Sequence, residues 1–516
     1  MPIYETLGFT GHPFAKTNAD EEPNLKDYFI PPAYFDAIIG DANTPTSSVV
    51  LAPRGAGKTA QRRMVEDHGL NSNFLAVTYD RFEFSGGQTV ADLSLQYHLK
   101  NIITRIIVSF LSYLTDYPDV VKSLSKAEKK ELSLFIQTYL GSLTGDKIQE
   151  LLKELRSLPD KFKDFWRENV GFMEPAVNFL LKKYDLETID LPDVKQEEKR
   201  LAETYKYQLE NLLNLVKRIG FKSIYILIDK VDETEQTGND PEQTYKLIQS
   251  LIRDLELLGL EGYAFKFFLW NKVEPFYREH ARPDRIIQYE LSWSRTDLKG
   301  ILSARLMAFS NGSISSFTQL MADNAGINVD DAICVMSNGS PRNMIRMCER
   351  ILAIQGELSL NSSKIDFKAV DRGILTFSEM FFLELYGNDL LKDMQRVGRE
   401  LFTTNYVAND VLKISGQGAR NKITGWSNTG LIQQVGTITV PPAKRPVNFY
   451  CAVDPVAVRL MHRTTALDTF FKDRWLPCDH CNTDNLVNIE LYPEENEAIC
   501  KKCGRVLIDQ QTTDAE

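Results

Sequence analysis

The stretch from Val49 to Arg63, VVLAPRGAGKTAQRR, constrains the fold more than any other part of this 516-residue chain. It starts with apolar, β-branched residues typical of a buried strand, passes through a turn of small residues and ends as a helix begins. A strand that leads through a tight turn into a helix is a unit of α/β folds. We therefore expect a parallel sheet covered on both faces by helices.

The turn in this unit, Ala52–Thr59, has the composition of a phosphate-binding loop, and we call it the glycine loop. The usual pattern is G-x-x-x-x-G-K-[S/T], and Ala52 stands in place of its first glycine. That position mainly needs a small residue, so Ala52 can serve. Gly55 and Gly57 let backbone N–H groups point into one concavity at a helix N-terminus. The predicted nucleotide-binding residues are Pro53, Arg54, Gly55, Ala56, Gly57, Lys58, Thr59 and Ala60.

Charged and hydroxyl side chains near this loop predict the chemistry of the site. Lys58 can bridge the β- and γ-phosphates of ATP, and the Thr59 hydroxyl can ligate Mg²⁺. Asp229 ends the apolar run IYILI, where it can hold the same Mg²⁺ through water. Asp232 and Glu233 follow three and four residues later, so one of them can polarise the attacking water. We favour Glu233 for this role, with Asp232 as the alternative.

Apolar runs separated by helical patterns predict the rest of the sheet and a long insertion. The expected strands are 49–51, 73–80, 221–234, 262–272 and 284–291. Residues 88–220 have apolar side chains at three- and four-residue spacing, which indicates a helical insertion. This insertion can be a sensor, an oligomerisation arm or a structural bundle. From Ser294 the chain turns helical again, with Asp297 completing a capping box and Pro341 opening a later helix.

The glycine loop, the strand that ends in Asp229 and a C-terminal helical lid resemble AAA+ and STAND ATPases. The spacing D-x-x-D-E is similar to the NACHT branch, in which the residue after the first Asp is usually small, whereas here it is Lys230. The segment SNGSPRNMIRMCERIL resembles the G-x-x-R helix of origin-recognition-type AAA+ proteins, with Gly339 and Arg342. The resemblance implies that Arg342 contacts the γ-phosphate and that Asn271 is the polar sensor residue.

Simpler roles remain open for these sensor residues, because Asn271 can cap a turn and Arg342 can lie on a solvated helix face. In related ATPases an arginine near Arg282 or Arg285 can reach the nucleotide of a neighbouring subunit, although exposed loop arginines are the simpler interpretation. The resemblance covers roughly residues 1–375 without the insertion. The predicted catalytic residues are Lys58, Asp229, Asp232, Glu233, Asn271 and Arg342.

Four cysteines near the C-terminus predict a metal site. Cys478, Cys481, Cys500 and Cys503 follow the pattern C-x2-C-x18-C-x2-C, in which two tight knuckles can close a tetrahedron around Zn²⁺. Four thiolates leave no open position, so we expect a structural zinc, with His480 outside the ligand set. Such pairs in a cytosolic chain indicate metal ligands rather than disulfides. The other three cysteines, which we expect to be packing residues, are Cys334, Cys348 and Cys451.

The segment before these cysteines has the element order of a winged helix: a helix, a short helix, a second helix, then two strands around a basic tip. We call Val411–Tyr450 the basic segment, because it holds five Lys and Arg and no acidic residue. Arg and Asn can read base edges in a major groove, and Lys can neutralise phosphate. Protein contact is the alternative use of such a domain. The predicted nucleic-acid contacts are Arg420, Asn421, Lys422, Lys444 and Arg445.

Composition sets limits on the function. A net charge of -10 means that DNA binding must come from a local patch. The N-terminus lacks a basic-then-apolar signal, and the apolar run 102–114 contains Arg105 and is too short to span a bilayer. We therefore expect a cytoplasmic protein without a membrane partner.

The expected fold is α/β: a parallel-sheet P-loop ATPase core with a large helical insertion and a helical lid, then a winged helix and a small zinc ribbon. The predicted domains are the core at 1–292 with its insertion at about 88–220, the lid at 293–375, the winged helix at 376–462 and the zinc ribbon at 470–510.

Two functions fit this organisation, with ATP, Mg²⁺ and Zn²⁺ as the expected cofactors. The first is an ATP-hydrolysing switch that couples nucleotide state to binding of double-stranded DNA and to homo-oligomer assembly. The second is a STAND-type signalling ATPase, for example in anti-phage defence, that senses a ligand and recruits a separate effector protein. A small-molecule kinase fits poorly, because it needs neither a zinc ribbon nor a winged helix.

Overall fold

The computed structural model describes residues 2–84, 86–114, 118–140, 150–151, 205–323, 326–439, 445–492 and 497–507. The chain divides into two compact units. The core unit is Pro31–Leu291, and the lid unit combines Met1–Ile30 with Ser292–Glu516. The expected core at 1–292 therefore differs from the compact unit at its start, because apolar residues such as Phe9 and Phe14 pack into the core of the lid unit.

The core unit is built on one parallel sheet, as predicted. Among the described residues, five strands form it in the order β2-β3-β4-β1-β5. They are β1 (Ser48–Ala52), β2 (Phe74–Tyr79), β3 (Ser223–Ile228), β4 (Tyr263–Trp270) and β5 (Ile287–Glu290). In the register, Ala52 lies opposite Trp270 and Ile228 opposite Phe267, so the glycine loop and Asp229 leave the same edge of the sheet. The strand expected at 221–234 ends earlier, because Lys230 has a left-handed backbone with φ of 57°.

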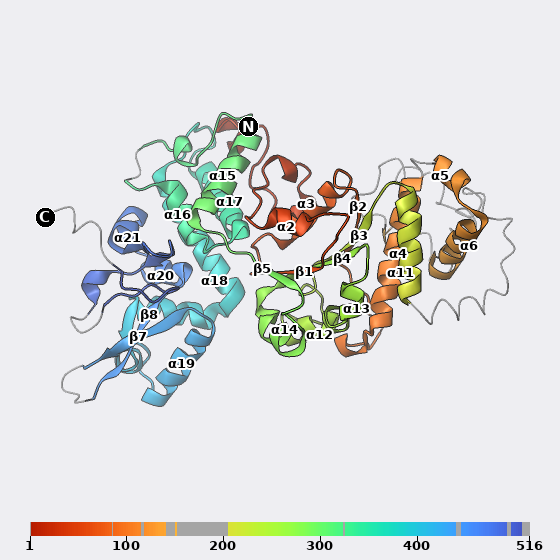
Figure 1. Cartoon of the computed structure of the whole chain (residues 1–516). Helices are drawn as coiled ribbons and strands as arrows, with labels where there is room; N and C mark the ends of the chain where they lie inside the picture. The colour runs from red at the N-terminus through yellow and green to blue at the C-terminus, as the bar shows by residue number, and fades with distance from the viewer. Residues whose placement is uncertain are drawn as a thin grey trace. The chain divides into compact units, whose positions relative to one another are not determined.

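Helices cover both faces of this sheet, and Figure 1 shows α2 and α3 on the opposite side from α12, α13 and α14. Their bounds are α2 (Phe35–Ile39), α3 (Lys58–Gly69), α12 (Pro241–Ile252), α13 (Leu255–Leu258), the short η5 (Asn271–Val273) and α14 (Glu274–His280). The strands β1 to β4 are buried along almost their whole length, as expected for a sheet with helices on both faces.

The described part of the insertion is helical. Its elements are η3 (Val90–Asp92), α4 (Leu95–Leu114), α5 (Pro118–Ser123), α6 (Lys126–Phe135), η4 (Ile136–Leu140) and α11 (Tyr205–Arg218). Helix α4 packs against β2 and α11, and its side chains are buried from Ile102 onward. Residues 152–204 of the predicted insertion lie outside the described residues. Among the helices that are described, none combines the length and the apolar character that crossing a bilayer requires.

One buried histidine makes the stability of the core unit depend on pH. His98 of α4 is fully buried among the rings of Tyr79, Phe82 and Tyr97, and its Nδ1 lies 2.8 Å from the Tyr79 hydroxyl. Burial lowers the pKa of His98 to about 4. The unfolded chain therefore binds more protons than the folded one between about pH 6.5 and 4, so stability falls as the pH falls through this window.

We expect the core unit to lose about 2 kcal/mol of unfolding free energy between pH 7 and pH 5 because of His98. Urea unfolding of wild type and His98→Phe at the two pH values measures this loss. The variant should be less stable at pH 7 but should lose less on acidification. The exposed His280 provides the matched control His280→Gln. If wild type and His98→Phe lost the same unfolding free energy between pH 7 and pH 5, His98 would not be the source of the pH dependence.

The lid unit begins with the N-terminal elements α1 (Ile3–Thr6), η1 (Ala19–Glu21) and η2 (Leu25–Asp27) and continues with the lid helices. The latter are α15 (Arg295–Phe309), η6 (Thr318–Leu320), α16 (Val329–Met336), α17 (Pro341–Leu358) and α18 (Phe367–Val397). The buried Arg305 of α15 joins the two parts through an ion pair of 2.9 Å with Glu22. The predicted capping box at Ser294 and the predicted first-turn position of Pro341 are both confirmed.

The C-terminal part of the lid unit holds a small antiparallel sheet and the cysteine-rich segment. After α18, which has a kink at Gly387, come β6 (Leu401–Thr403), η7 (Tyr406–Leu412), α19 (Gly416–Asn428), β7 (Ile432–Ile438) and β8 (Val447–Ala452). The strands pair in the order β6-β8-β7. The final elements are α20 (Pro455–Met461), α21 (Leu467–Arg474), β9 (Trp475–Pro477), β10 (Asp484–Leu486) and η8 (Ile489–Leu491). This element order is the one expected of a winged helix followed by a ribbon, and the winged-helix assignment stays a prediction.

Candidate nucleotide site and zinc centre

The glycine loop follows β1 directly and ends where α3 begins. Gly55 and Gly57 have positive φ values of 78° and 101°, a conformation that side chains with a Cβ rarely adopt. Gly57 is the N-cap of α3, with no side-chain cap, so the first N–H groups of the helix are available to a ligand. Lys58 is the first residue of α3. The local backbone is therefore the one that an anion site at a helix N-terminus needs.

Lys58 lies among the predicted acidic residues rather than in solvent. Its side chain is buried, and burial lowers the pKa of Lys58 while the nearby Asp232, Asp229 and Glu233 raise it. Asp232 has the strongest of these three effects. The structure thus brings together a lysine and three carboxylates that come from two separate stretches of the sequence, next to the loop.

Asp229 fits a role in holding Mg²⁺. Its carboxyl group is 1% exposed, and neither oxygen has a hydrogen bond of regular geometry, although Arg62 Nε lies 3.5 Å from Oδ2 and the Thr59 hydroxyl is nearby. Burial raises the pKa of Asp229, while Arg62, Lys58 and the nearby Thr59 hydroxyl lower it. A buried carboxylate without a hydrogen bond is costly unless a cation compensates it. The Thr59 hydroxyl and Asp229 are hard oxygen donors of the kind that Mg²⁺ prefers.

A buried group of ion pairs next to the glycine loop was not predicted from the sequence. Arg62 of α3 is 1% exposed and pairs with Glu66 at 2.8 Å and with Asp229 at 3.5 Å. Glu66 also accepts a hydrogen bond from the Thr78 hydroxyl on β2. The Arg62–Glu66 spacing of four residues on a helix was the available sequence signal. This group gives Asp229 a fixed positive neighbour within the protein.

The two candidates for polarising water differ in their surroundings. Asp232 is 5% exposed, and its carboxylate accepts a hydrogen bond of 2.7 Å from Arg54 Nε of the glycine loop. Glu233 is exposed. Lys230, which follows Asp229, turns away to pair with Asp80 at 3.3 Å after β2. Lys230 has a positive φ of 57°, a backbone conformation that residues with a Cβ rarely adopt.

The structure gives fewer contacts for the predicted sensor residues, Asn271 and Arg342, and for Arg282 and Arg285, the arginines that could reach the nucleotide of a neighbouring subunit. Asn271 follows β4, the strand beside β1, and is half-buried at the start of η5. Arg342 is exposed on α17 of the lid unit, so its contact with a phosphate stays a prediction. Arg282 forms two hydrogen bonds of 2.9 Å with Asp284, and Arg285 pairs with the same residue at 3.8 Å. Arg282, Asp284 and Arg285 are all exposed, and a contact of either arginine with the nucleotide of a neighbouring subunit stays a prediction.

The four predicted metal ligands lie together in the lid unit. The Sγ atoms of Cys478, Cys481, Cys500 and Cys503 are all within 4.8 Å of one another. The distance is 3.6 Å for the pair Cys478–Cys503 and 3.5 Å for Cys481–Cys500. Thiolates at about 2.3 Å around a tetrahedral zinc are about 3.8 Å apart, so the cluster has the size of a zinc site. His480 is exposed and lies outside this group.

The two halves of the cysteine cluster have the same backbone turn. Asn482 N–H donates to the backbone oxygen of Cys478 at 2.8 Å, and Gly504 N–H donates to the backbone oxygen of Cys500 at 2.9 Å. Asn482 and Gly504 both have positive φ, at the same position of the two knuckles. The Thr483 hydroxyl lies 3.3 Å from Cys481 Sγ. As expected, Cys334, Cys348 and Cys451 are buried packing residues.

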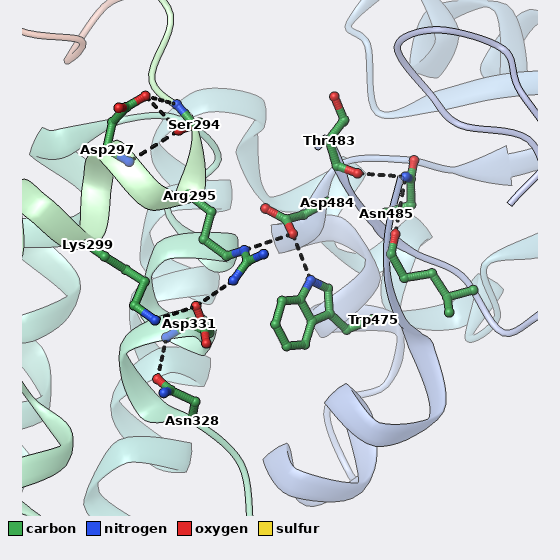
Figure 2. A network of polar contacts seen from close by, with 11 residues as sticks. Ser294, Arg295, Asp297, Lys299, Asn328, Asp331, Trp475, Thr483, Asp484 and Asn485 are labelled. Carbon is green, nitrogen blue, oxygen red and sulfur yellow. Dashed lines mark hydrogen bonds and ion pairs between the residues drawn. The ribbon is translucent and has the colours of Figure 1, made fainter. Parts of the chain in front are cut away.

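A network of polar contacts joins the lid helices α15 and α16 to Trp475 and Asp484, which lie on either side of the first cysteine pair in the sequence, as Figure 2 shows. The Arg295 guanidinium of α15 bonds Asp331 of α16 at 2.7 Å and Asp484 of β10 at 3.2 Å. It also lies 4.8 Å from the centre of the Trp475 ring, and Trp475 Nε1 donates to Asp484 at 2.9 Å. Lys299 makes a second ion pair to Asp331 at 3.0 Å. Because Asp484 is three residues from Cys481, these contacts connect the first turn of α15 to the first cysteine knuckle.

The basic segment is partly engaged within the chain. Helix α19 exposes Arg420 and Asn421, which are linked through Gln417 by hydrogen bonds of 3.1 and 3.0 Å. Lys422, in contrast, pairs with Asp393 of α18 at 2.5 Å. Counting charges within the basic segment alone therefore overlooks Asp393, a carboxylate from another helix that neutralises Lys422. Arg445 is exposed before β8, and the predicted contact Lys444 lies outside the described residues.

Comparisons with known proteins find solved structures that are similar to this chain, including the three below at 10–12% identity. No family model matches the chain, and no curated protein matches it. Cdc6p from Pyrobaculum aerophilum has a TM-score of 0.32 at 10% identity, covering 89% of this chain and 98% of its own. The ORC2 protein of Aeropyrum pernix, solved with ADPNP and ADP, has a TM-score of 0.37 at 10% identity, covering 88% of this chain and 98% of its own. A RuvB mutant from Thermotoga maritima has a TM-score of 0.29 at 12% identity, covering 82% and 93%.

At these identities and TM-scores the likeness carries no information on activity. The fold itself is clear from the chain: a parallel sheet with the glycine loop after β1 and Asp229 after β3, at one edge. The α/β P-loop core expected from the sequence is therefore confirmed, and its activity has to be argued from the residues of the site.

Proposed function

We propose that this protein is an ATP-binding and ATP-hydrolysing switch that couples its nucleotide state to the binding of double-stranded DNA and to assembly with copies of itself. The observation that carries the proposal is the position of Lys58, buried at the start of α3 beside Asp229 and Asp232. A buried ammonium group at a helix N-terminus is suited to polyphosphate.

In the proposed reaction the glycine loop and Lys58 bind the phosphates. Thr59 and Asp229 would hold Mg²⁺, which neutralises charge on the β- and γ-phosphates. Asp232 and Glu233 are the candidates that orient and deprotonate the attacking water. Asn271 and, from the lid, Arg342 would read the γ-phosphate. Loss of the γ-phosphate would remove the contact proposed for Arg342, and hydrolysis would in this way change the state of the lid.

The basic segment is proposed to contact DNA through the exposed Arg420 and Asn421 of α19, with Arg445 and Lys444 at the tip. The pairing of Lys422 with Asp393 makes Lys422 the weakest member of this set. We also propose that the cysteine cluster holds a structural Zn²⁺. Four sulfur ligands at tetrahedral spacing support this occupant, which would stabilise the fold and take no part in catalysis.

The experiment that tests the proposal measures ATP turnover and DNA binding in wild type, Arg420→Ala and the control Arg372→Ala, each with and without duplex DNA at two salt concentrations. Arg372 is an exposed arginine on α18 outside the basic segment. We expect DNA to raise turnover in wild type and in the control, and salt to weaken this effect. Arg420→Ala should weaken DNA binding and reduce the salt slope by about 1. An ATP turnover rate that is the same with and without duplex DNA would contradict the DNA-coupled switch.

The alternative is a STAND-type sensor, which is favoured by the D-x-x-D-E spacing from Asp229 and by the large helical insertion, whereas Lys230 departs from the NACHT pattern. It predicts nucleotide binding that is indifferent to DNA and a separate effector protein that associates only with the ATP-bound form. The same turnover experiment distinguishes the two candidates. A result without DNA dependence but with tight ATP binding would support the sensor.

A further inference from the structure

The glycine loop carries one long charged side chain that a phosphate cradle does not require. Arg54 lies between Pro53 and Gly55, with about a third of its side chain exposed. It is directed to protein groups: Nε donates to Asp232 Oδ2 at 2.7 Å, and Nη2 donates to the Asp232 backbone oxygen at 2.9 Å. One guanidinium therefore binds both the carboxylate and the main chain of the same residue.

Two further contacts fix the guanidinium from other directions. Nη1 donates to the Asn239 side-chain oxygen, and the guanidinium carbon lies 4.2 Å from the centre of the Trp270 ring. Asp232 and Asn239 belong to one stretch, residues 229–240, which we call the acidic turn. Trp270 is the last residue of β4 and directly precedes Asn271. Arg54 thus connects the glycine loop to the acidic turn at two points and to the end of the neighbouring strand.

The chemistry of arginine accounts for this choice of residue. A planar guanidinium can donate several hydrogen bonds in fixed directions and stack on an aromatic ring at the same time, whereas lysine has a single point charge on a flexible stem. Asp232 is 5% exposed and is the acidic group that most strongly raises the pKa of Lys58. The position of Asp232 therefore affects the lysine that binds phosphate.

We propose that Arg54 is a positioning residue that clamps the acidic turn to the glycine loop and so keeps Asp232 beside Lys58 during ATP hydrolysis. The inference rests on the proposed ATPase function. It assigns Arg54 a task different from the one expected from the sequence, where it was one of several residues around the phosphates. Arg54 then acts on the reaction through Asp232 and leaves the affinity for ATP largely unchanged.

Kinetics and nucleotide binding test this role in Arg54→Ala, Arg54→Lys, Asp232→Asn and the double variant, with Arg253→Ala as a surface control. We expect Arg54→Ala to lower kcat roughly tenfold to hundredfold, the range for loss of charged hydrogen bonds, with an ATP Kd within about twofold of wild type. Arg54→Lys should recover only part of the rate. The double variant should be no slower than the slower single variant, because both changes break one unit.

A direct phosphate contact would give a different pattern. In that case Arg54→Ala would weaken ATP binding by the same factor as it lowers kcat/KM, kcat would stay unchanged, and its effect would add to that of Asp232→Asn. This pattern overturns the inference. The test is thus a comparison of kcat against Kd rather than a loss of activity alone.

Hydrogen exchange keeps the inference testable if wild type shows no turnover. Backbone amides of the acidic turn should exchange faster in Arg54→Ala than in wild type without any nucleotide. Amides in the C-terminal half of α12, beyond the turn capped by Asp240, should not change. Absent turnover with this exchange difference would reject hydrolysis but keep the clamp. Unchanged exchange in the acidic turn would reject the clamp, whatever the turnover is.

Discussion

Replacing Lys58 by Ala is expected to abolish ATP turnover and to weaken ATP binding. The ammonium group is buried beside Asp232 and Asp229, so the loop loses its charged donor to phosphate and the two carboxylates lose a positive neighbour. Removing one preorganised donor at a reacting centre lowers kcat by about 10²–10³-fold, and an ATP site should lose at least this much. Steady-state turnover and calorimetric ATP titration measure the two effects.

A matched control separates this loss from a general effect of removing a lysine. Lys222 is exposed at the start of β3, and Lys222→Ala should retain wild-type turnover. Circular dichroism and the unfolding midpoint show whether the Lys58 variant is folded. A folded Lys58→Ala protein that hydrolyses ATP at the wild-type rate would contradict the placement of the phosphates on the glycine loop.

Replacing Cys500, a ligand of the proposed zinc, is expected to have the largest effect on the lid unit. Cys500 is fully buried in a cluster that also contains Leu401, Phe449 and Cys451 from the neighbouring sheet. Free energies of structural zinc binding reach about 10–16 kcal/mol, and a ribbon of this size has little apolar core of its own. We expect Cys500→Ser to lose its bound zinc and to unfold the ribbon. Metal analysis of the purified protein gives the first readout.

Hydrogen exchange gives the second readout of zinc loss, because the ribbon is tied to the lid. When the knuckle loses its shape, Asp484 no longer holds Arg295, and the first turn of α15 should exchange faster. Cys334→Ala is the matched control, since Cys334 is buried but lies outside the metal group. It should keep one zinc per chain. Full zinc content in Cys500→Ser would rule out the four-cysteine site.

Features that depend on neighbouring residues in the chain were predictable. The glycine loop, the capping box at Ser294 and the cysteine knuckles each have their signal within a few residues, and the structure places them as expected. The parallel sheet followed from apolar runs separated by helical patterns. The end of β3 was predicted too late, because the left-handed backbone at Lys230 has no marker such as glycine.

Contacts between distant parts of the chain were not predictable from spacing. Arg54 and Asp232 are 178 residues apart, and Arg295 and Asp484 are 189 apart. The pairing of Lys422 with Asp393 changes the charge expected for the basic segment, and nothing near Lys422 in the sequence signals it. Such pairings depend on which helices and strands pack together, so they require the tertiary structure.

The lid unit also has a consequence for synthesis of the chain on the ribosome. Its first 30 residues pack against helices that begin only at Arg295, and Glu22 finds its partner in Arg305. The core unit is complete before any of these helices is made. At about 5–20 residues per second, apolar side chains such as Phe9 and Phe14 wait roughly 15–60 s for their partners. This N-terminal segment therefore remains without its packing partners after every described strand of the core sheet has been synthesised.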